Sequence, residues 1–134
     1  MGWDRISCVV VLALLLLSTS LSSGCFRSSG IPNGVRFASE CDPTPSRVGR
    51  STFTVALTTS SGERLAGAHV SLEGDMSHAG MSPVFGETRE VVPGRYQGTL
   101  DLSMRGDWSV LFHITLPSGQ TFHRQLNLRN IQAT

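Results

Sequence analysis

The chain has 134 residues, a net charge of +1 and 40% hydrophobic residues, which suits one small domain. The near-neutral charge excludes the strong electrostatic field that favours nucleic-acid binding, and we expect no nucleic-acid partner. The chain contains no lysine, so mechanisms that need a lysine amine, such as a Schiff base, are excluded.

Residues 1–24 are predicted to be a signal peptide. Arg5 precedes the apolar run 6–17, which is too short to span a bilayer and is typical of a signal-peptide hydrophobic region. The following "SSGC" resembles a bacterial lipobox, although Ser22 occupies the position where leucine is usual. We therefore expect lipidation of Cys25, with ordinary signal cleavage nearby as the alternative. Either way, we expect the mature protein to work outside the cytoplasm, in the periplasm or cell envelope.

The cysteines allow two arrangements in the mature protein. If Cys25 carries lipid, then Cys41 is a lone thiol. If Cys25 is not lipidated, the two cysteines could form a disulfide, which an oxidising compartment permits. The fold must in both cases depend mainly on its hydrophobic core.

Short alternating segments follow a tether rich in Ser, Gly, Pro and Asn at residues 26–34. In segment 107–116, for example, Trp108, Val110, Phe112 and Ile114 share one face. Period-two alternation indicates strands with one buried face and one solvated face. The expected strands are 35–39, 51–57, 68–74, 87–92, 95–104, 107–116 and 120–128.

These strands predict an all-β fold. About seven short strands in about 100 residues are typical of an Ig-like β-sandwich, although the immunoglobulin Cys–Trp–Cys pattern is absent. We expect a signal peptide at 1–24, a lipidated or disordered tether with a first strand at 25–42, and the sandwich at 43–134.

The segment 74–87, "GDMSHAGMSPVFGE", combines three soft or borderline metal donors in a loop. Thioethers select Cu(I), and imidazole is a good borderline donor. In extended chain, Met76 and His78 point to one side with their Cα atoms about 7 Å apart, and Gly80 allows a turn that returns Met81. Met76 also keeps the register of the preceding strand, so core packing is the alternative.

Other candidate donors follow the loop. Met104, at the end of an expected strand, is a fourth candidate ligand, although strand alternation alone favours core packing for it. His113 and His123 lie on the non-core faces of neighbouring expected strands, where they could pair or bind a metal; we interpret them, and His69, as exposed surface residues. No hydrolase, zinc-protease, P-loop or dinucleotide-binding motif is present, so we expect no enzyme activity.

The ordered motifs resemble the YtkA-like/FixH-like domain family over about residues 43–128. The similarity is carried by "GERLAGAHV", the Met/His loop, "PGRYQG" at 93–98 and "SMRGDW" at 103–108. The resemblance implies an extracytoplasmic Ig-like β-sandwich linked to copper handling and cytochrome oxidase assembly. Carried over by position, it implies metal ligands at Met76, His78, Met81 and Met104.

The sequence therefore predicts a lipid-anchored, Cu(I)-binding domain that sequesters copper or hands it to a membrane or envelope partner. Two features depart from the family: a cleavable-looking signal replaces the retained membrane helix of FixH-like proteins, and the loop has a single histidine. The alternative is a metal-free interaction module of an envelope complex, with the Met-rich loop as an adaptable apolar contact.

Overall fold

The computed structural model describes residues 30–44 and 46–133, and it shows an all-β fold of seven antiparallel strands. The predicted signal peptide and Cys25 lie outside the described residues. Within that part of the chain, no helix has the length and apolar character needed to cross a bilayer. The strands are β1 (Val35–Asp42), β2 (Gly49–Thr59), β3 (His69–Met76), β4 (Val84–Val92), β5 (Arg95–Leu102), β6 (Gly106–Thr115) and β7 (Thr121–Ile131).

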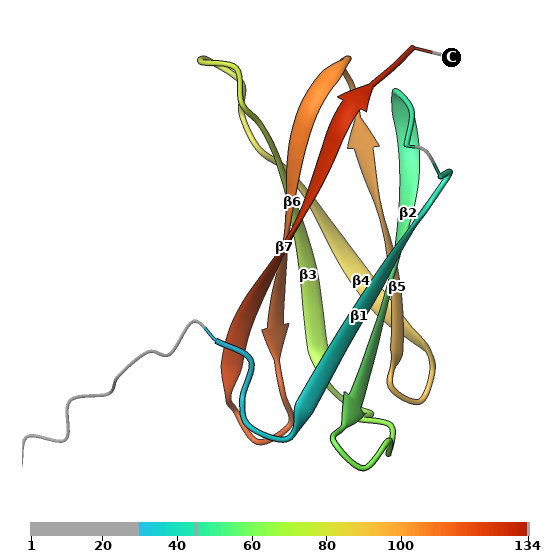
Figure 1. Ribbon diagram of the computed structural model, residues 1–134, viewed down its shortest axis with the longest axis vertical. Helices are drawn as coiled ribbons and strands as arrows, with labels where there is room; N and C mark the ends of the chain where they lie inside the picture. The colour runs from blue at the N-terminus through green and yellow to red at the C-terminus, as the bar shows by residue number, and fades with distance from the viewer. Residues whose placement is uncertain (1–29, 45, 134) are drawn as a thin grey trace, which may run out of the picture.

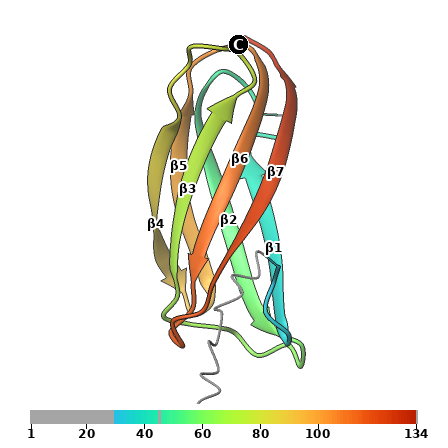
Figure 2. The same ribbon diagram turned by 90° about the vertical axis from the view of Figure 1, so that its left-hand side faces the viewer.

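The strands form one curled sheet in the order β1-β2-β5-β4-β3-β6-β7. β4 belongs to both layers of the sandwich, because its first half pairs with β3 and its second half pairs with β5. Figure 2 shows β3, β6 and β7 in front, with β1 and β2 behind them. The predicted sandwich of seven strands is confirmed.

Strict alternation in the central strands builds the core between the layers. In β6, Trp108, Val110, Phe112 and Ile114 are all buried, as the sequence predicted. The other core side chains come mainly from β2, β3 and β5: Phe53, Val55, Leu57, Val70, Leu72, Met76, Tyr96, Leu100 and Leu102. Burying side chains of this size stabilises the fold by about 1.5–3 kcal/mol each before chain entropy is subtracted.

The loops that connect the strands lie at the two ends of the sandwich (Figure 1). One end carries the β3–β4 loop (77–83), the β5–β6 loop (103–105) and the C-terminal residues. The opposite end carries residues 30–34, where the described chain begins, and the turns that precede β3, β5 and β7. The predicted metal ligands all belong to the first of these ends.

Candidate metal centre at the loop end of the sandwich

Met76 is the last residue of β3 and lies at the boundary between core and loop. It pairs with Trp108 of β6 and is only 6% exposed. The core packing that its register allows is therefore confirmed. Its position at the strand end still brings its terminal methyl group to the rim of the sandwich, beside the first residue of β6.

Met76 and His78 converge over Gly106. A Cβ atom on Gly106 would lie 3.1 Å from Met76 Cε and 3.8 Å from His78 Cε1. Gly106 has a φ of +128°, which side-chain-bearing residues rarely adopt. Because Gly106 has no side chain, the thioether of Met76 and the imidazole of His78 can both approach this position.

Met81 returns toward the sandwich after a turn. Its N–H donates a 3.4 Å hydrogen bond to the carbonyl of His78, and Gly80 within the turn has a φ of +87°. The Met81 side chain is half-buried and packs against the core. The turn that Gly80 was predicted to allow is therefore present, and the return of Met81 to Met76 and His78 stays a prediction.

Met104 lies on the neighbouring β5–β6 loop. β5 ends at Leu102, so Met104 falls in the loop and is 48% exposed; the core packing that strand alternation favoured for it is wrong. Met104 lines a shallow groove together with Val48 and Ala133. The structure brings Met76 and His78 toward Gly106, whereas Met76 and Met104 line two different grooves.

The donor chemistry at this end is soft. Among residues 30–44 and 46–133, no group of three or more His, Cys, Asp or Glu side chains is arranged to hold a metal ion. The candidate donors that approach Gly106 are the thioether of Met76 and the imidazole of His78, and Asp75 and Asp107 line the adjoining groove. The thioether and imidazole by themselves suit Cu(I) better than zinc or calcium.

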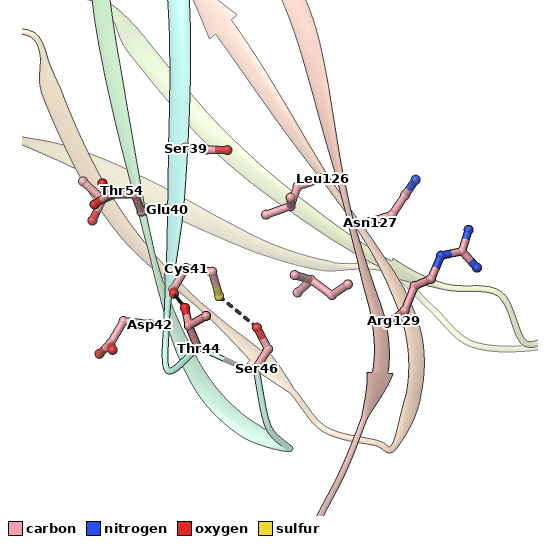
Figure 3. Close-up of a pocket in the computed structure, with 11 residues that line it drawn as sticks. Ser39, Glu40, Cys41, Asp42, Thr44, Ser46, Thr54, Leu126, Asn127 and Arg129 are labelled. Atoms are coloured by element: carbon pink, nitrogen blue, oxygen red, sulfur yellow. Dashed lines mark hydrogen bonds between the residues drawn. The ribbon is translucent and has the colours of Figure 1, made fainter.

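A groove also lies away from the loop end, between the two edge strands β1 and β7 (Figure 3). Its volume is about 660 Å³, and Cys41 of β1 and Leu126 of β7 line it from opposite sides. Cys41 has no disulfide partner in the part of the chain that the structure describes, and its Sγ lies 3.1 Å from Ser46 Oγ. Burial raises the pKa of this thiol, so the uncharged form is favoured.

Sequence patterns did not reveal this groove. It exists because the curled sheet brings its first and last strands near each other, and Arg124 of β7 lies over the Phe37 ring of β1. A single sequence shows that both segments are strands, but it does not show that they face each other.

Comparison with solved structures agrees with the fold. A DUF4785 family protein from Legionella pneumophila has a TM-score of 0.52 and 16% sequence identity, over 75% of this chain and 29% of that chain. The chain thus spans less than a third of that protein, and the likeness concerns the fold alone. No curated protein matches the sequence significantly.

The comparison with protein families is more specific. The model of the YtkA-like family matches residues 32–113, which is more than half of the chain. The match includes β1 to β5, the Met/His loop and most of β6. The chain belongs to the YtkA-like family.

Proposed function

We propose that this protein is an extracytoplasmic, lipid-anchored domain that binds Cu(I) at the loop end of the sandwich and sequesters it or hands it to a membrane or envelope partner. Met76 and His78 are the first two donors, and Met81 is the third. Met104, on the neighbouring loop, is the fourth. Assembly of a respiratory oxidase is a process that such copper transfer would serve.

The convergence of Met76 and His78 over Gly106 carries this proposal. Both side chains approach Gly106, one from β3 and one from the loop that follows it, and the strand holds the first donor in place. Met76 is largely shielded from water, and a neutral thioether needs no deprotonation before it binds a soft ion. The exposed His78 supplies the second donor from the solvent side.

The two remaining donors require a modest rearrangement. Met81 is half-buried near the core, and Met104 is exposed on a separate loop. Long, unbranched methionine side chains can change direction by rotation about their χ angles. We therefore expect Cu(I) to draw the 77–83 and 103–105 loops together without changing the strands.

A competition titration with a Cu(I) chelator tests the site. The double substitution Met76→Leu and Met81→Leu keeps volume and apolar character, so it should cost less than about 1.5 kcal/mol of stability at each position. It should nevertheless abolish Cu(I) binding. His78→Gln should weaken binding, and Met104→Leu should weaken it less. Unchanged Cu(I) affinity in the double variant, with the fold intact, would reject the proposed centre.

A second candidate function is a metal-free interaction module. Phe85 of β4 is 71% exposed and Met104 is 48% exposed, so the domain presents large apolar side chains that a partner could cover. Capture of envelope proteins with and without Cu(I) separates the candidates. Metal-independent capture that Phe85→Ser abolishes would favour this second function.

The proposed anchor depends on Cys25. Mass spectrometry of the native mature N-terminus should find Cys25 as the first residue, carrying lipid. Cys25→Ser should release the protein from membranes. An unmodified N-terminus at another residue would remove the anchor from the proposal but would leave the Cu(I) site unaffected.

A further inference from the structure

Two histidines face each other on the outer surface of the β3–β6–β7 layer. His113 of β6 and His123 of β7 are directly opposite in the strand register, and their Nδ1 atoms are 3.0 Å apart. The preceding residues Phe112 and Phe122 are buried in the core, so alternation directs both imidazoles outward. The strands therefore hold these two side chains next to each other.

Glu73 orients this pair from the third strand. Its Oε2 lies 2.7 Å from His113 Nε2, and the two side chains are only 29% and 34% exposed. A carboxylate accepts a hydrogen bond, so Glu73 favours a proton on Nε2 of His113. In the neutral form of that ring, the Nδ1 lone pair faces His123. A carboxylate bound to the far nitrogen of an imidazole is the usual outer support of a metal-binding histidine.

The spacing of the two nitrogens fits a particular coordination geometry. Metal–nitrogen bonds to histidine are about 2.0–2.1 Å long, so nitrogens 3.0 Å apart would subtend an angle of about 90° at a shared ion. That angle belongs to neighbouring positions of a square-planar or octahedral complex, and a tetrahedral angle would need the nitrogens about 3.3–3.4 Å apart. For nitrogen donors, the Irving–Williams order also places Cu(II) above Ni(II) and Zn(II). Nitrogen donors in tetragonal geometry indicate Cu(II) or Ni(II).

The surroundings of the pair do not oppose a cation. In the register, Ser71 is the neighbour of His113 on β3, and Glu87 lies opposite Ser71 on β4. The flanking cross-strand pairs on β6 and β7 are Leu111 with Gln125 and Thr115 with Thr121. His69, one row away, is engaged with Glu87 at 3.4 Å.

We propose that His113 and His123 form a second metal site, which binds Cu(II) more tightly than Ni(II) or Zn(II), with Glu73 as its positioning residue. On binding, His123 carries its proton on Nε2, and both Nδ1 atoms coordinate the ion. Water fills the remaining positions. The site lies on the outer face of the sandwich and shares no residue with the proposed Cu(I) centre, so either proposal can fail without the other.

Cu(II) binding to the untagged mature protein tests this site. Electron paramagnetic resonance should show hyperfine coupling to two imidazole nitrogens, and calorimetry with CuSO₄ and NiCl₂ should give the metal order. Loss of an outer-shell partner lowers metal affinity about 10- to 100-fold, so Glu73→Gln should lower Cu(II) affinity by that factor. His113→Gln or His123→Gln removes a ligand itself, so each should lower Cu(II) affinity at least about tenfold.

A matched control is available in His69→Gln. His69 also faces a carboxylate but has no second histidine opposite, because its register partner on β6 is Thr115. This control and the Met76→Leu, Met81→Leu variant should keep full Cu(II) affinity. If His123→Gln binds Cu(II) as tightly as the unaltered protein, or if His69→Gln causes an equal loss, the site is refuted. His123 is exposed, so its variant remains informative even if His113→Gln folds poorly.

Discussion

The indole Nε1 of Trp108 donates a 3.0 Å hydrogen bond to the backbone carbonyl of Met104. This contact ties the β5–β6 loop to a core side chain that is itself the register partner of Met76. The two loops of the proposed Cu(I) centre therefore share one buried anchor.

Replacing Trp108 with Phe should test this anchor. The change removes the hydrogen bond and leaves a small cavity, so we expect a loss of about 1–3 kcal/mol in the free energy of unfolding. Urea denaturation measures the loss, and amide exchange reports on residues 103–105. Exchange in the loop should accelerate; an unchanged rate there would show that the indole does not hold it.

Gly106 and Gly80 both have positive φ values, but only a substitution at Gly106 should disturb the Met76 and His78 side chains. A methyl group on Gly80 would meet no atom within 4 Å, whereas one on Gly106 would approach Met76 Cε and His78 Cε1. Gly80→Ala should cost about 1–2 kcal/mol from backbone strain alone. Gly106→Ala should cost about 1–3 kcal/mol, shift the NMR signals of Met76 and His78, and weaken Cu(I) binding. Equal effects of the two substitutions on these signals would contradict the convergence.

Tyr96 supports the opposite end of the sandwich. Its buried hydroxyl donates a 2.7 Å hydrogen bond to the carbonyl of Leu65 and accepts one of 3.0 Å from the N–H of Ala68. Tyr96→Phe leaves both backbone groups without this partner, so stability should fall by about 1–3 kcal/mol. Thr99→Ser, on the exposed face of the same strand, should change it by less than about 0.5 kcal/mol. Comparable urea midpoints for the two variants would dismiss the role of the hydroxyl.

Glu90 should make stability depend on acid pH. Hydrogen bonds from the N–H groups of Gly94 and Gly67 hold the pKa of its carboxyl below the ordinary value of 4.5. Folding therefore favours the carboxylate, and this contribution is present above pH 4.5 and is lost as the pH falls through the lowered pKa. Urea midpoints measured from pH 7 to pH 3 should fall less steeply in Glu90→Gln than in the unaltered protein.

Glu63→Gln provides the comparison for that titration, since Glu63 is an exposed glutamate in a nearby turn. A Glu90→Gln profile no flatter than that of Glu63→Gln would show that the Gly94 and Gly67 contacts do not influence the titration of Glu90.

Cys41 should react slowly with thiol reagents. Burial raises its pKa above the ordinary 9.0, with Asp42 adding to the increase and the Ser46 hydrogen bond opposing it. The reactive thiolate is therefore scarcer at pH 8 than in an unfolded chain, and the reaction rate should have its midpoint above pH 9. Ser46→Ala should move the midpoint further up. One titratable thiol per mature chain is expected if Cys25 is lipidated, whereas a Cys25–Cys41 disulfide would leave none.

The fold was largely predictable because strand alternation is a local signal. The segment 107–116 was expected to bury Trp108, Val110, Phe112 and Ile114, and the structure confirms this. The prediction for Met104 was wrong because alternation does not show where a strand stops. β5 ends two residues earlier, before a turn that Gly106 makes with a positive φ.

The surroundings of the candidate sites were less predictable, because they depend on which strands are neighbours in the sheet. His113 and His123 were expected on the non-core faces of adjacent strands, and the β6–β7 register confirms that placement. The contact of Glu73 with His113 was not predicted, because residues that pair between β3 and β6 are 30 or more positions apart in the sequence. The Cys41 groove was missed for the same reason, because it depends on the approach of β1 to β7.

The position of residues 30–34 has a consequence for copper exchange. They enter the sandwich at the end opposite the 77–83 loop (Figure 1), and strands of 8 to 11 residues separate the two ends, a distance of roughly 30 Å. If Cys25 carries a lipid, the end of the sandwich nearest its attachment would therefore be the one opposite the proposed Cu(I) donors. A copper donor or acceptor, in a membrane protein or a soluble carrier, would then need to reach the far end of the domain.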